Sequence, residues 1–538
     1  MTLTVINLDT PTLGDRSYIA HDGKTALAVD PQRDIDRVQA ILDREGLTLG
    51  GVVETHMHND YVSGGLVLAK EHGAKYIVSE MDPVTFERVT VADNQIEEIG
   101  DFAVRAIHTP GHTFTHMSYA LIDGAEKAHG VFTGGSMLHG STGRPDLLGM
   151  DKARELAGLQ HGSLNRLAGM LEDGVTVHPT HGFGSFCAAT ATCGDSSTIA
   201  DEKKTNPALL LEKEAYIVQT LAGLDVFPAY YKHMGPANHA GPGPIDLSEL
   251  ARMSTEEVMK AMKAGAWIVD LRTRSSWAAS HVPGTMSFGI DGSMATYFGW
   301  MFPYEEQLIL MSDKASDIAE AQRELVRIGI DRPSGSFVGN VAEFDNSKTT
   351  RTVKFEAVPA VIGTPEVHVL DVRRTSEREA SHIEPSLHIP LHELEGAGAD
   401  HRACATLGAG DLGHIGFGVV TLTKCQRCWR LDPEDRKGLG QDEVRARALQ
   451  LQGNGRSVYG CSRLKVARLT IAAEDCTNVV GVVLQSGRNV DEAVVVEDHS
   501  IGIEVGAVVE LHAAAQLERI GEAVGAHLIA LCEHWNDL

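Results

Sequence analysis

The stretch Val52–Gly65, VVETHMHNDYVSGG, decides how this chain is interpreted. It opens with apolar and β-branched residues, as a short buried strand does, and continues into a segment with two histidines two positions apart. Side chains two apart on an extended segment point the same way, so His56 and His58 can face one ion. Asp60 adds a carboxylate two positions further on. The stretch therefore predicts a metal site at the end of a strand.

The residues around this stretch predict an α/β domain over residues 1–240. Residues 17–30 are expected to form a hairpin, and the apolar spacing of 34–46 and 152–174 predicts two helices. Further strands are expected at 74–80, 102–109, 117–122, 130–135 and 175–182. The histidines recur where a strand gives way to a loop, which is where α/β proteins gather ligands.

Two distant histidines can complete the site. His112 lies in HTPGHT, on a Pro-Gly turn after a strand, and His181 lies in HPTHGFGS in a similar position. The chain has 25 histidines, so a single His-x-His pair would be weak evidence. The complete set, each member following a predicted strand, is what favours a metal centre.

Composition narrows the classes of function. The chain has 538 residues, so three or four domains are expected, with 43% hydrophobic and 22% charged residues. Acidic residues outnumber basic ones 73 to 47, which disfavours nucleic acid and anionic membranes as partners. No secretory signal and no long apolar run is recognised. Of eight cysteines only Cys187 and Cys193 precede residue 400, so a disulfide scaffold is not expected and a reducing cytoplasm is.

Beyond residue 240 the sequence predicts further α/β units. Residues 233–244 are rich in Pro and Gly and are interpreted as a linker. A second α/β unit is expected over 245–345, and a third begins at 350–400. The segments 267–288 and 368–389 align without gaps, which indicates an internal repeat. Residues 401–538 open with a Gly- and Ala-rich texture of little periodicity, and no fold is assigned to them.

Four segments in order carry a resemblance to a known family: THMHNDYVSGG, HTPGHTFTHMSYAL, VFTGGSMLHGSTGRPDLLG and HPTHGFGSF. Together they resemble the metallo-β-lactamase superfamily, and within it the bacterial persulfide dioxygenase–rhodanese fusions. The resemblance implies an N-terminal αββα sandwich over 1–240, followed by rhodanese-like α/β domains and a C-terminal tail of uncertain fold.

The resemblance places two metal subsites on this chain. The first maps onto His56, His58 and His112, and the second onto Asp60, the residue after it and His181. The residue after Asp60 is Tyr61, where the family often has histidine. We expect all four histidines to be metal ligands, and Asp60 and Tyr61 to be catalytic residues.

A second departure is Gly135, which stands where the family's bridging or iron-ligating aspartate ends the FTGD strand. With that carboxylate and one imidazole gone, a binuclear zinc site is disfavoured. We expect one Fe(II) per chain, with zinc as the alternative, and Asp60 or Asp146 as the oxygen ligand. On this alignment Gly135→Asp should strengthen metal binding.

The resemblance also implies a reaction and its alternatives. A low-molecular-weight thiol persulfide, such as that of glutathione, would react with O₂ and water to give sulfite and thiol. Arg144 matches the family's arginine near the thiol substrate, and a salt bridge to Asp146 is the competing interpretation. The alternatives are a zinc-dependent hydroxyacylglutathione-type thioester hydrolase and a metal-poor, non-catalytic sulfur carrier or scaffold. The fold often pairs, so a homodimer is compatible with it.

The rhodanese-like repeats lack the expected cysteine. In that family an Asp-x-Arg motif braces a loop whose cysteine thiolate accepts sulfane sulfur. In the first repeat Ser312 and Asp313 stand there instead, and no cysteine lies between Cys193 and Cys404, so a structural role is expected. In the tail, Cys461 is a weak formal match to that cysteine. The Cys-x-x-Cys of Cys425 and Cys428 lacks a second pair for zinc, so adventitious thiols are expected.

Overall fold

The computed structural model describes residues 3–192, 194–349, 368–382 and 386–393, together with the strands 405–409, 418–422, 469–472 and 479–482. The chain divides into two compact units. One comprises Met1–Thr273 with Thr285–Asp345, and the other Arg274–Gly284 with Asn346–Leu538.

The first sheet of the larger unit has six strands in sequence order. They are β1 (Thr4–Thr10), β2 (Asp15–His21), β3 (Thr25–Val29), β4 (Thr48–Val53), β5 (Lys75–Ser79) and β6 (Val89–Val91). β2 and β3 pair antiparallel around Gly23, whose φ of 91° suits glycine, so the predicted hairpin is confirmed. Along β3, Ala26 and Ala28 enter one core while Leu27 and Val29 enter another, as a strand buried on both faces requires.

The second sheet also has six strands, in the order β14-β13-β10-β9-β8-β7. Their bounds are β7 (Ile96–Glu98), β8 (Ala103–His108), β9 (Met117–Ile122), β10 (Ala128–Gly134), β13 (Thr176–Pro179) and β14 (Ser197–Thr198). A small ribbon of β11 (Met137–Leu138) and β12 (Ser141–Thr142) follows β10. The strands expected at 102–109, 117–122, 130–135 and 175–182 are therefore confirmed.

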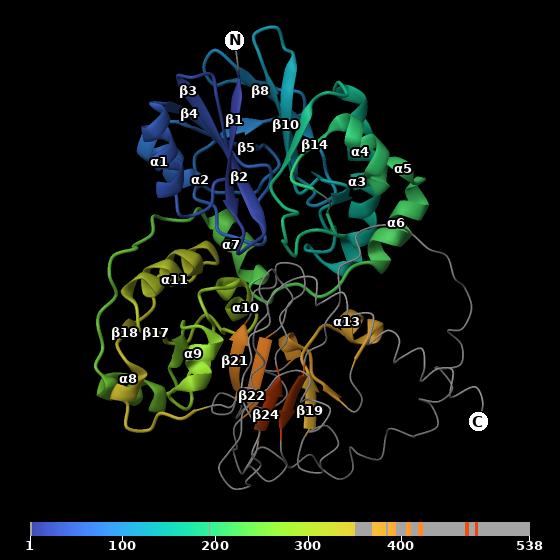
Figure 1. The fold of residues 1–538 in the computed structure, drawn as a ribbon. Coiled ribbons are helices and arrows are strands. Elements are labelled where there is room, and N and C mark those ends of the chain that lie inside the picture. The colour runs from blue at the N-terminus through green and yellow to red at the C-terminus, as the bar shows by residue number, and fades with distance from the viewer. Residues whose placement is uncertain are drawn as a thin grey trace, which may run out of the picture. The chain divides into compact units, whose positions relative to one another are not determined.

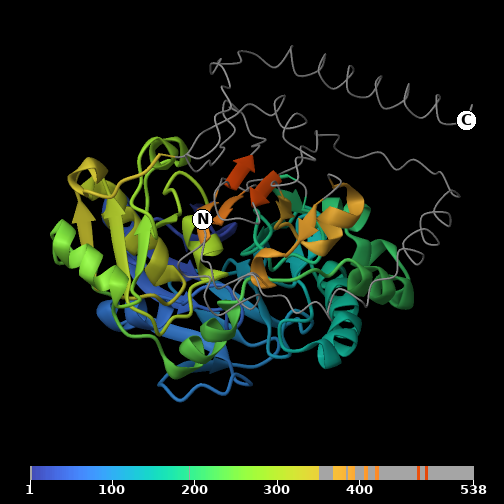
Figure 2. The same cartoon turned by 90° about the horizontal axis from the view of Figure 1, so that it is seen from below.

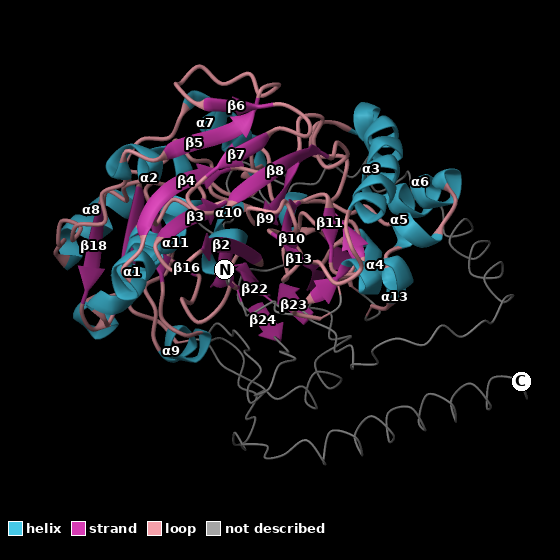
Figure 3. Cartoon of the chain, turned by 90° about the horizontal axis from the view of Figure 1, so that it is seen from above, coloured by secondary structure: helices cyan, strands magenta, loops and turns pink. Residues whose placement is uncertain are grey.

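Helices cover the outer face of each sheet (Figures 1 and 3). The first sheet packs against α1 (Asp36–Glu45) and α2 (Gly65–His72). The second is covered by α3 (Met150–Met170), α4 (Ile199–Thr205), α5 (Pro207–Leu210) and α6 (Lys213–Ala222). A third core lies between the sheets, where Tyr18 and Ile77 of the first meet Tyr119 and Phe132 of the second. These three cores make the four layers of the predicted αββα sandwich.

The segment interpreted as a linker is folded. Residues 231–240 form α7 (Tyr231–Ala240), which contains Pro236 and ends at Gly241 in the left-handed region. Met234 and Asn238 are buried on it. The linker prediction for 233–244 is therefore wrong over most of its length, because buried contacts stabilise a helix that its Pro and Gly content disfavours.

Residues 245–273 and 285–345 add a smaller sheet to the larger unit, and Figure 2 shows its yellow-green strands side by side. Its strands run parallel in the order β16-β15-β17-β18. Its elements are α8 (Thr255–Lys263), β15 (Trp267–Asp270), β16 (Met286–Ser287), α10 (Met294–Gly299), β17 (Leu308–Ser312), α11 (Ala315–Arg327), β18 (Gly335–Val338) and the 3₁₀ turn Val341–Glu343. We call this part the β15–β18 domain; its rhodanese-like assignment stays a prediction.

The second unit contains α9 (Arg274–Ala279), and His281, two residues after its end, forms an antiparallel bridge with Lys348. Its larger sheet has the order β20-β19-β23-β24, and β21 pairs with β22. The bounds are β19 (His368–Asp371), α13 (Thr375–Ala380), β20 (Leu387–His388), the 3₁₀ turn Leu391–Glu393, β21 (Ala405–Ala409), β22 (Gly418–Leu422), β23 (Leu469–Ala472) and β24 (Val479–Val482). Cys425, Cys428 and Cys461 lie outside the described residues.

The Asp-x-Arg motif forms the same ion pair in both repeats. Arg272 donates to both carboxylate oxygens of Asp270, and Arg373 does so to Asp371. The shared geometry supports the internal repeat read from the sequence. Among the helices that the structure describes, none is long and apolar enough to cross a bilayer.

Candidate metal centre

The predicted ligands lie on three loops, each following a strand. The loop after β4 carries His56, His58 and Asp60, the loop after β8 carries His112, and the loop after β13 carries His181. All five side chains are buried. The short connections hold these polar groups at strand ends, where the sequence pattern placed them.

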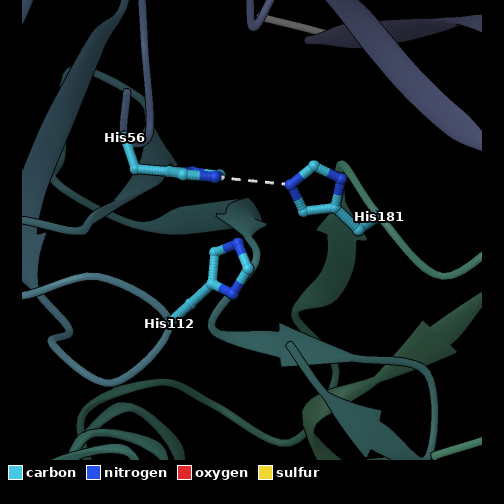
Figure 4. Close-up of side chains that lie close together, drawn as sticks. All are labelled: His56, His112 and His181. Atoms are coloured by element: carbon cyan, nitrogen blue, oxygen red, sulfur yellow. Dashed lines mark hydrogen bonds between the residues drawn. The ribbon is translucent and has the colours of Figure 1, made fainter. Parts of the chain in front are cut away.

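Three imidazoles from these loops converge. His56, His112 and His181 each offer a ring nitrogen, and these atoms lie within 4.8 Å of one another. The Nε2 atoms of His56 and His181 are 3.3 Å apart, and the ring of His112 lies beside the gap between them (Figure 4). Three histidines are a common zinc ligand set.

Hydrogen bonds fix two of these rings with Nε2 unprotonated. The Nδ1 of His112 donates to the main-chain carbonyl of Arg144 at 2.9 Å, which leaves Nε2 with a lone pair. The Nδ1 of His56 lies 2.9 Å from the hydroxyl of Thr55, which itself donates to Asp30 at 2.7 Å. That hydroxyl must therefore accept from His56. Metal-binding histidines are typically oriented in this way.

His181 is oriented by carboxylates. Its Nδ1 lies 2.9 Å from Asp15 Oδ1 and 3.0 Å from Asp60 Oδ2, so this nitrogen carries a proton. Burial lowers the pKa of His181, but Asp60 and Asp15 outweigh burial and raise it to about 10. A carboxylate–histidine pair of this kind raises the basicity of the nitrogen that faces a metal.

His58 belongs to a second, overlapping group. His58, Asp60 and His181 offer ligand atoms within 4.8 Å of one another, so His181 is common to both groups. The Nε2 of His58 lies 2.9 Å from the hydroxyl of Tyr61, which donates to the carbonyl of Asp30. Nε2 therefore donates, and Nδ1 is the nitrogen left for a ligand. Tyr61 positions His58 in this structure.

Three ligand atoms lack a hydrogen-bond partner among the described residues: His58 Nδ1, Asp60 Oδ1 and His112 Nε2. A buried polar atom left unpaired costs about 1–3 kcal/mol. All three of these atoms belong to predicted ligands, and a bound cation would give each of them a partner. The residues present therefore suit a bound transition metal ion.

Buried acidic groups supply negative charge around the ligands. Asp30 and Glu54 lie 3.3 and 3.4 Å from His58 Nε2. Burial lowers the pKa of His58, but these two carboxylates outweigh it and raise the value to about 9. Burial holds the pKa of His112 down to about 3, which keeps that ring neutral. A divalent cation can replace the protons that His58 and His181 otherwise hold.

Gly135 packs directly against a ligand. Its N–H donates to His116 Nε2 at 3.1 Å, and a Cβ on Gly135 would lie 2.2 Å from Cδ2 of His112. An aspartate here would displace the His112 ring before it could contribute a carboxylate. This packing leads us to expect weaker metal binding in Gly135→Asp, the opposite of the expectation from the alignment.

Arg144 is engaged by an acidic residue of its own loop and by two carbonyls from other segments. Its guanidinium donates to both oxygens of Asp146 at 2.7 Å and also to the carbonyls of Phe186 and Asp225. Both partners of the ion pair are buried, with 4% of each side chain exposed. Of the two interpretations of Arg144, the structure shows the salt bridge; its role in substrate binding stays a prediction. Asp146 is committed to Arg144, whereas Asp60 lies among the ligands.

Several residues that position the ligands were not identified from the sequence. Asp15, Asp30, Glu54 and Thr55 are described above. Asn238, on α7, donates to the carbonyls of His58 and Tyr61 at 2.8 and 2.9 Å and accepts from the amide of Ser63. Asp30 offered a signal in the sequence, since it is a polar residue directly after the apolar run that forms β3. Asn238 offered none within its Pro- and Gly-rich segment.

Comparison with known proteins identifies the family. The chain is 31% identical over 166 residues to a probable polyketide biosynthesis zinc-dependent hydrolase, BaeB, of Bacillus velezensis, covering 30% of this chain and 69% of that protein. A metallo-β-lactamase structure from Staphylococcus aureus subsp. aureus COL matches with a TM-score of 0.56 and 24% identity, covering 63% of this chain and 100% of the other. The chain belongs to the metallo-β-lactamase superfamily.

Two other relatives also match part of the chain. The lactamase-like protein notP of an Aspergillus species is 29% identical, covering 38% of this chain and 60% of its own length. The hydroxyacylglutathione hydrolase of Acidiphilium cryptum is 35% identical, covering 21% of this chain and 48% of that protein. The chain thus spans about half to two thirds of the length of these curated relatives. No family model matches it.

Proposed function

We propose that this metallo-β-lactamase superfamily protein is a single-metal enzyme that oxidises the terminal sulfur of a low-molecular-weight thiol persulfide, RSSH. With O₂ and water, RSSH would yield sulfurous acid and the thiol RSH, which balances atoms. The observation that carries the proposal is the group of His58, Asp60 and His181. Two imidazoles and one carboxylate with open positions are the ligand set that suits non-haem Fe(II).

The two departures from the family pattern support one ion rather than two. Tyr61 occupies the position of an imidazole ligand, and its hydroxyl is engaged with His58 and Asp30. Gly135 occupies the position of the bridging carboxylate, and the ring of His112 leaves no room for a side chain there. Hydrolysis by a two-metal site is disfavoured on both grounds.

The protein's own residues would orient the ligands and exclude solvent from them. A bound iron would supply adjacent positions for sulfur and O₂. Asp15 fixes His181, and Tyr61 with Glu54 fixes His58, so each ring presents one nitrogen. All of these groups are buried, which strengthens their electrostatic interactions with charged species.

Zinc-dependent thioester hydrolysis is the second candidate. The three-imidazole group of His56, His112 and His181 favours it, because such a set suits zinc with a water in the fourth position. The relatives named as a zinc-dependent hydrolase and a hydroxyacylglutathione hydrolase also favour it. The two candidates share His181 and differ in their other two ligands.

The experiment measures metal content, O₂ uptake with glutathione persulfide, and cleavage of a glutathione thioester by the full chain. Iron with O₂ uptake supports the dioxygenase, and zinc with thioester cleavage supports the hydrolase. A protein without metal is the non-catalytic carrier or scaffold. Asp60→Ala should abolish iron binding while His112→Ala only weakens it. The reverse order would favour the three-imidazole site.

A further inference from the structure

We infer that the β15–β18 domain positions the metal-ligand loop, and that Arg327 at the end of α11 is the residue through which it does so. The ligand loop is His56–Gly65. The amide of Val62, next to Tyr61, donates to the carbonyl of Arg327 at 2.7 Å. The inference rests on the metal centre of the proposed function, and it concerns a residue that touches no ligand.

The side chain of Arg327 is anchored on the sandwich itself. Its Nη2 donates to Asp34 Oδ2 at 2.7 Å, and its Nη1 to Glu324 Oε1 at 3.1 Å. Asp34 follows β3 in the chain, and Glu324 accepts from the hydroxyl of Thr12 at 2.9 Å. Arg327 and Asp34 have 6% and 1% of their side chains exposed. A buried, hydrogen-bonded pair of this kind fixes geometry in a way that an exposed pair does not.

The chain just after α11 also packs on the ligand loop. Gly329 has a φ of 79°, and a Cβ there would lie 3.4 Å from Cγ2 of Val62. Nearby, Tyr304 donates to the carbonyl of Ile328, and its ring stacks on His233 of α7 at 4.1 Å. The end of α11 and α7, which carries Asn238, thus support the same loop.

The position of this contact on α11 is informative. In a rhodanese the cysteine loop precedes this helix, and here that loop holds Ser312, Asp313 and Lys314 instead. Ser312 is engaged with Asp317 at 2.7 Å. The opposite end of the helix makes the contact with the ligand loop. The β15–β18 domain lacks the sulfur-carrying cysteine, and it would still hold the ligand loop of the metal centre in position.

Two other arginines, Arg323 and Arg33, form ion pairs between the same parts without contacting the ligand loop. Arg323 donates to both oxygens of Asp36 at 2.6 and 2.8 Å, and Arg33 pairs with Asp331. Asp36 has 58% of its side chain exposed. Asp36→Asn is therefore the control, because it weakens this exposed domain contact and changes no atom to which Arg327 is hydrogen-bonded.

The experiment compares Arg327→Met, Arg327→Lys and Asp36→Asn in the full chain. Hydrogen exchange of metal-free protein reports on the ligand loop, and cobalt titration with visible spectra reports on ligand affinity and geometry. Arg327→Met should speed exchange in the ligand loop and weaken cobalt binding by roughly tenfold or more, the effect typical of residues that orient ligands. Arg327→Lys should recover part of both effects, and Asp36→Asn should match wild type.

Two results would overturn the inference. One is wild-type loop exchange and cobalt binding in Arg327→Met, even where its unfolding temperature falls. The other is an equal change of loop exchange and cobalt binding in Asp36→Asn. That result would show that any contact between the domains has this effect, and that Arg327 has no specific role. If wild type binds no cobalt, the proposed function fails, while loop exchange still decides whether Arg327 holds the loop.

Discussion

The main chain of Gly135 lies so close to His112 that a Cβ would come within 2.2 Å of Cδ2 of the ring. In the family pattern a carboxylate stands at this position. Here the imidazole packs against the bare main chain, and its Nδ1 is held by the carbonyl of Arg144 at 2.9 Å. The site is therefore built around the missing carboxylate, rather than being a family site with one ligand deleted.

Adding a side chain at Gly135 should weaken metal binding. Gly135→Ala and Gly135→Asp would both push His112 from its place, and we expect roughly a tenfold or larger loss of affinity, as when ligand orientation is disturbed. Cobalt titration measures it. Gly174→Ala is the control, since a Cβ there meets nothing within 4 Å. Tighter binding by Gly135→Asp would restore the family-based expectation.

Asn238 should matter for the metal centre although it is on α7. Asn238→Ala removes both donors to the carbonyls of His58 and Tyr61. Leaving these buried carbonyls unpaired should cost about 1–3 kcal/mol of stability each and lower metal affinity. Urea unfolding and metal titration measure the two effects. Asn165→Ala serves as a control at a more exposed site. Equal changes in stability and metal affinity in the two variants would count against a role of Asn238 in holding the ligand loop.

Variants of the Arg144–Asp146 pair distinguish an effect on stability from an effect on substrate binding. Arg144→Met leaves the buried carboxylate of Asp146 alone, which should cost about 3–5 kcal/mol of stability. The double variant with Asp146→Asn should recover much of that cost. Steady-state kinetics on the double variant then tests the substrate role. An unchanged KM for the persulfide would exclude it, and a raised KM with unchanged kcat would support it.

Metal affinity should rise with pH. In metal-free protein, Asp60 and Asp15 outweigh burial and raise the pKa of His181 to about 10, and Asp30 and Glu54 likewise raise that of His58 to about 9. Below these values protons compete with the ion, so affinity falls as pH falls. Titration calorimetry at pH 6, 7 and 8 in two buffers measures affinity and proton release. Binding that is independent of pH and releases no protons would show that neither ring is a ligand.

Clear periodicities predicted the individual strands and helices of residues 1–240, and the resemblance to the metallo-β-lactamase superfamily predicted their αββα layers. The alternation along β3 and the spacing of Val38, Ile41 and Leu42 on α1 both reflect one-sided or two-sided burial. The histidines were found because each follows a strand. The sequence could not predict which histidines share one ion. That depends on which ring nitrogen of each histidine is already hydrogen-bonded to a neighbouring residue. Asn238 was missed because packing overrides the local preference of a Pro- and Gly-rich segment.

The most direct test of the central claim is elemental analysis of the full chain purified without oxygen, beside His181→Ala. His181 belongs to both ligand groups, so its loss should matter whichever metal is bound. We predict one transition metal ion per chain in the wild type and a large loss in the variant. Absence of a stoichiometric ion from the wild type, or an unchanged content in His181→Ala, would contradict the account.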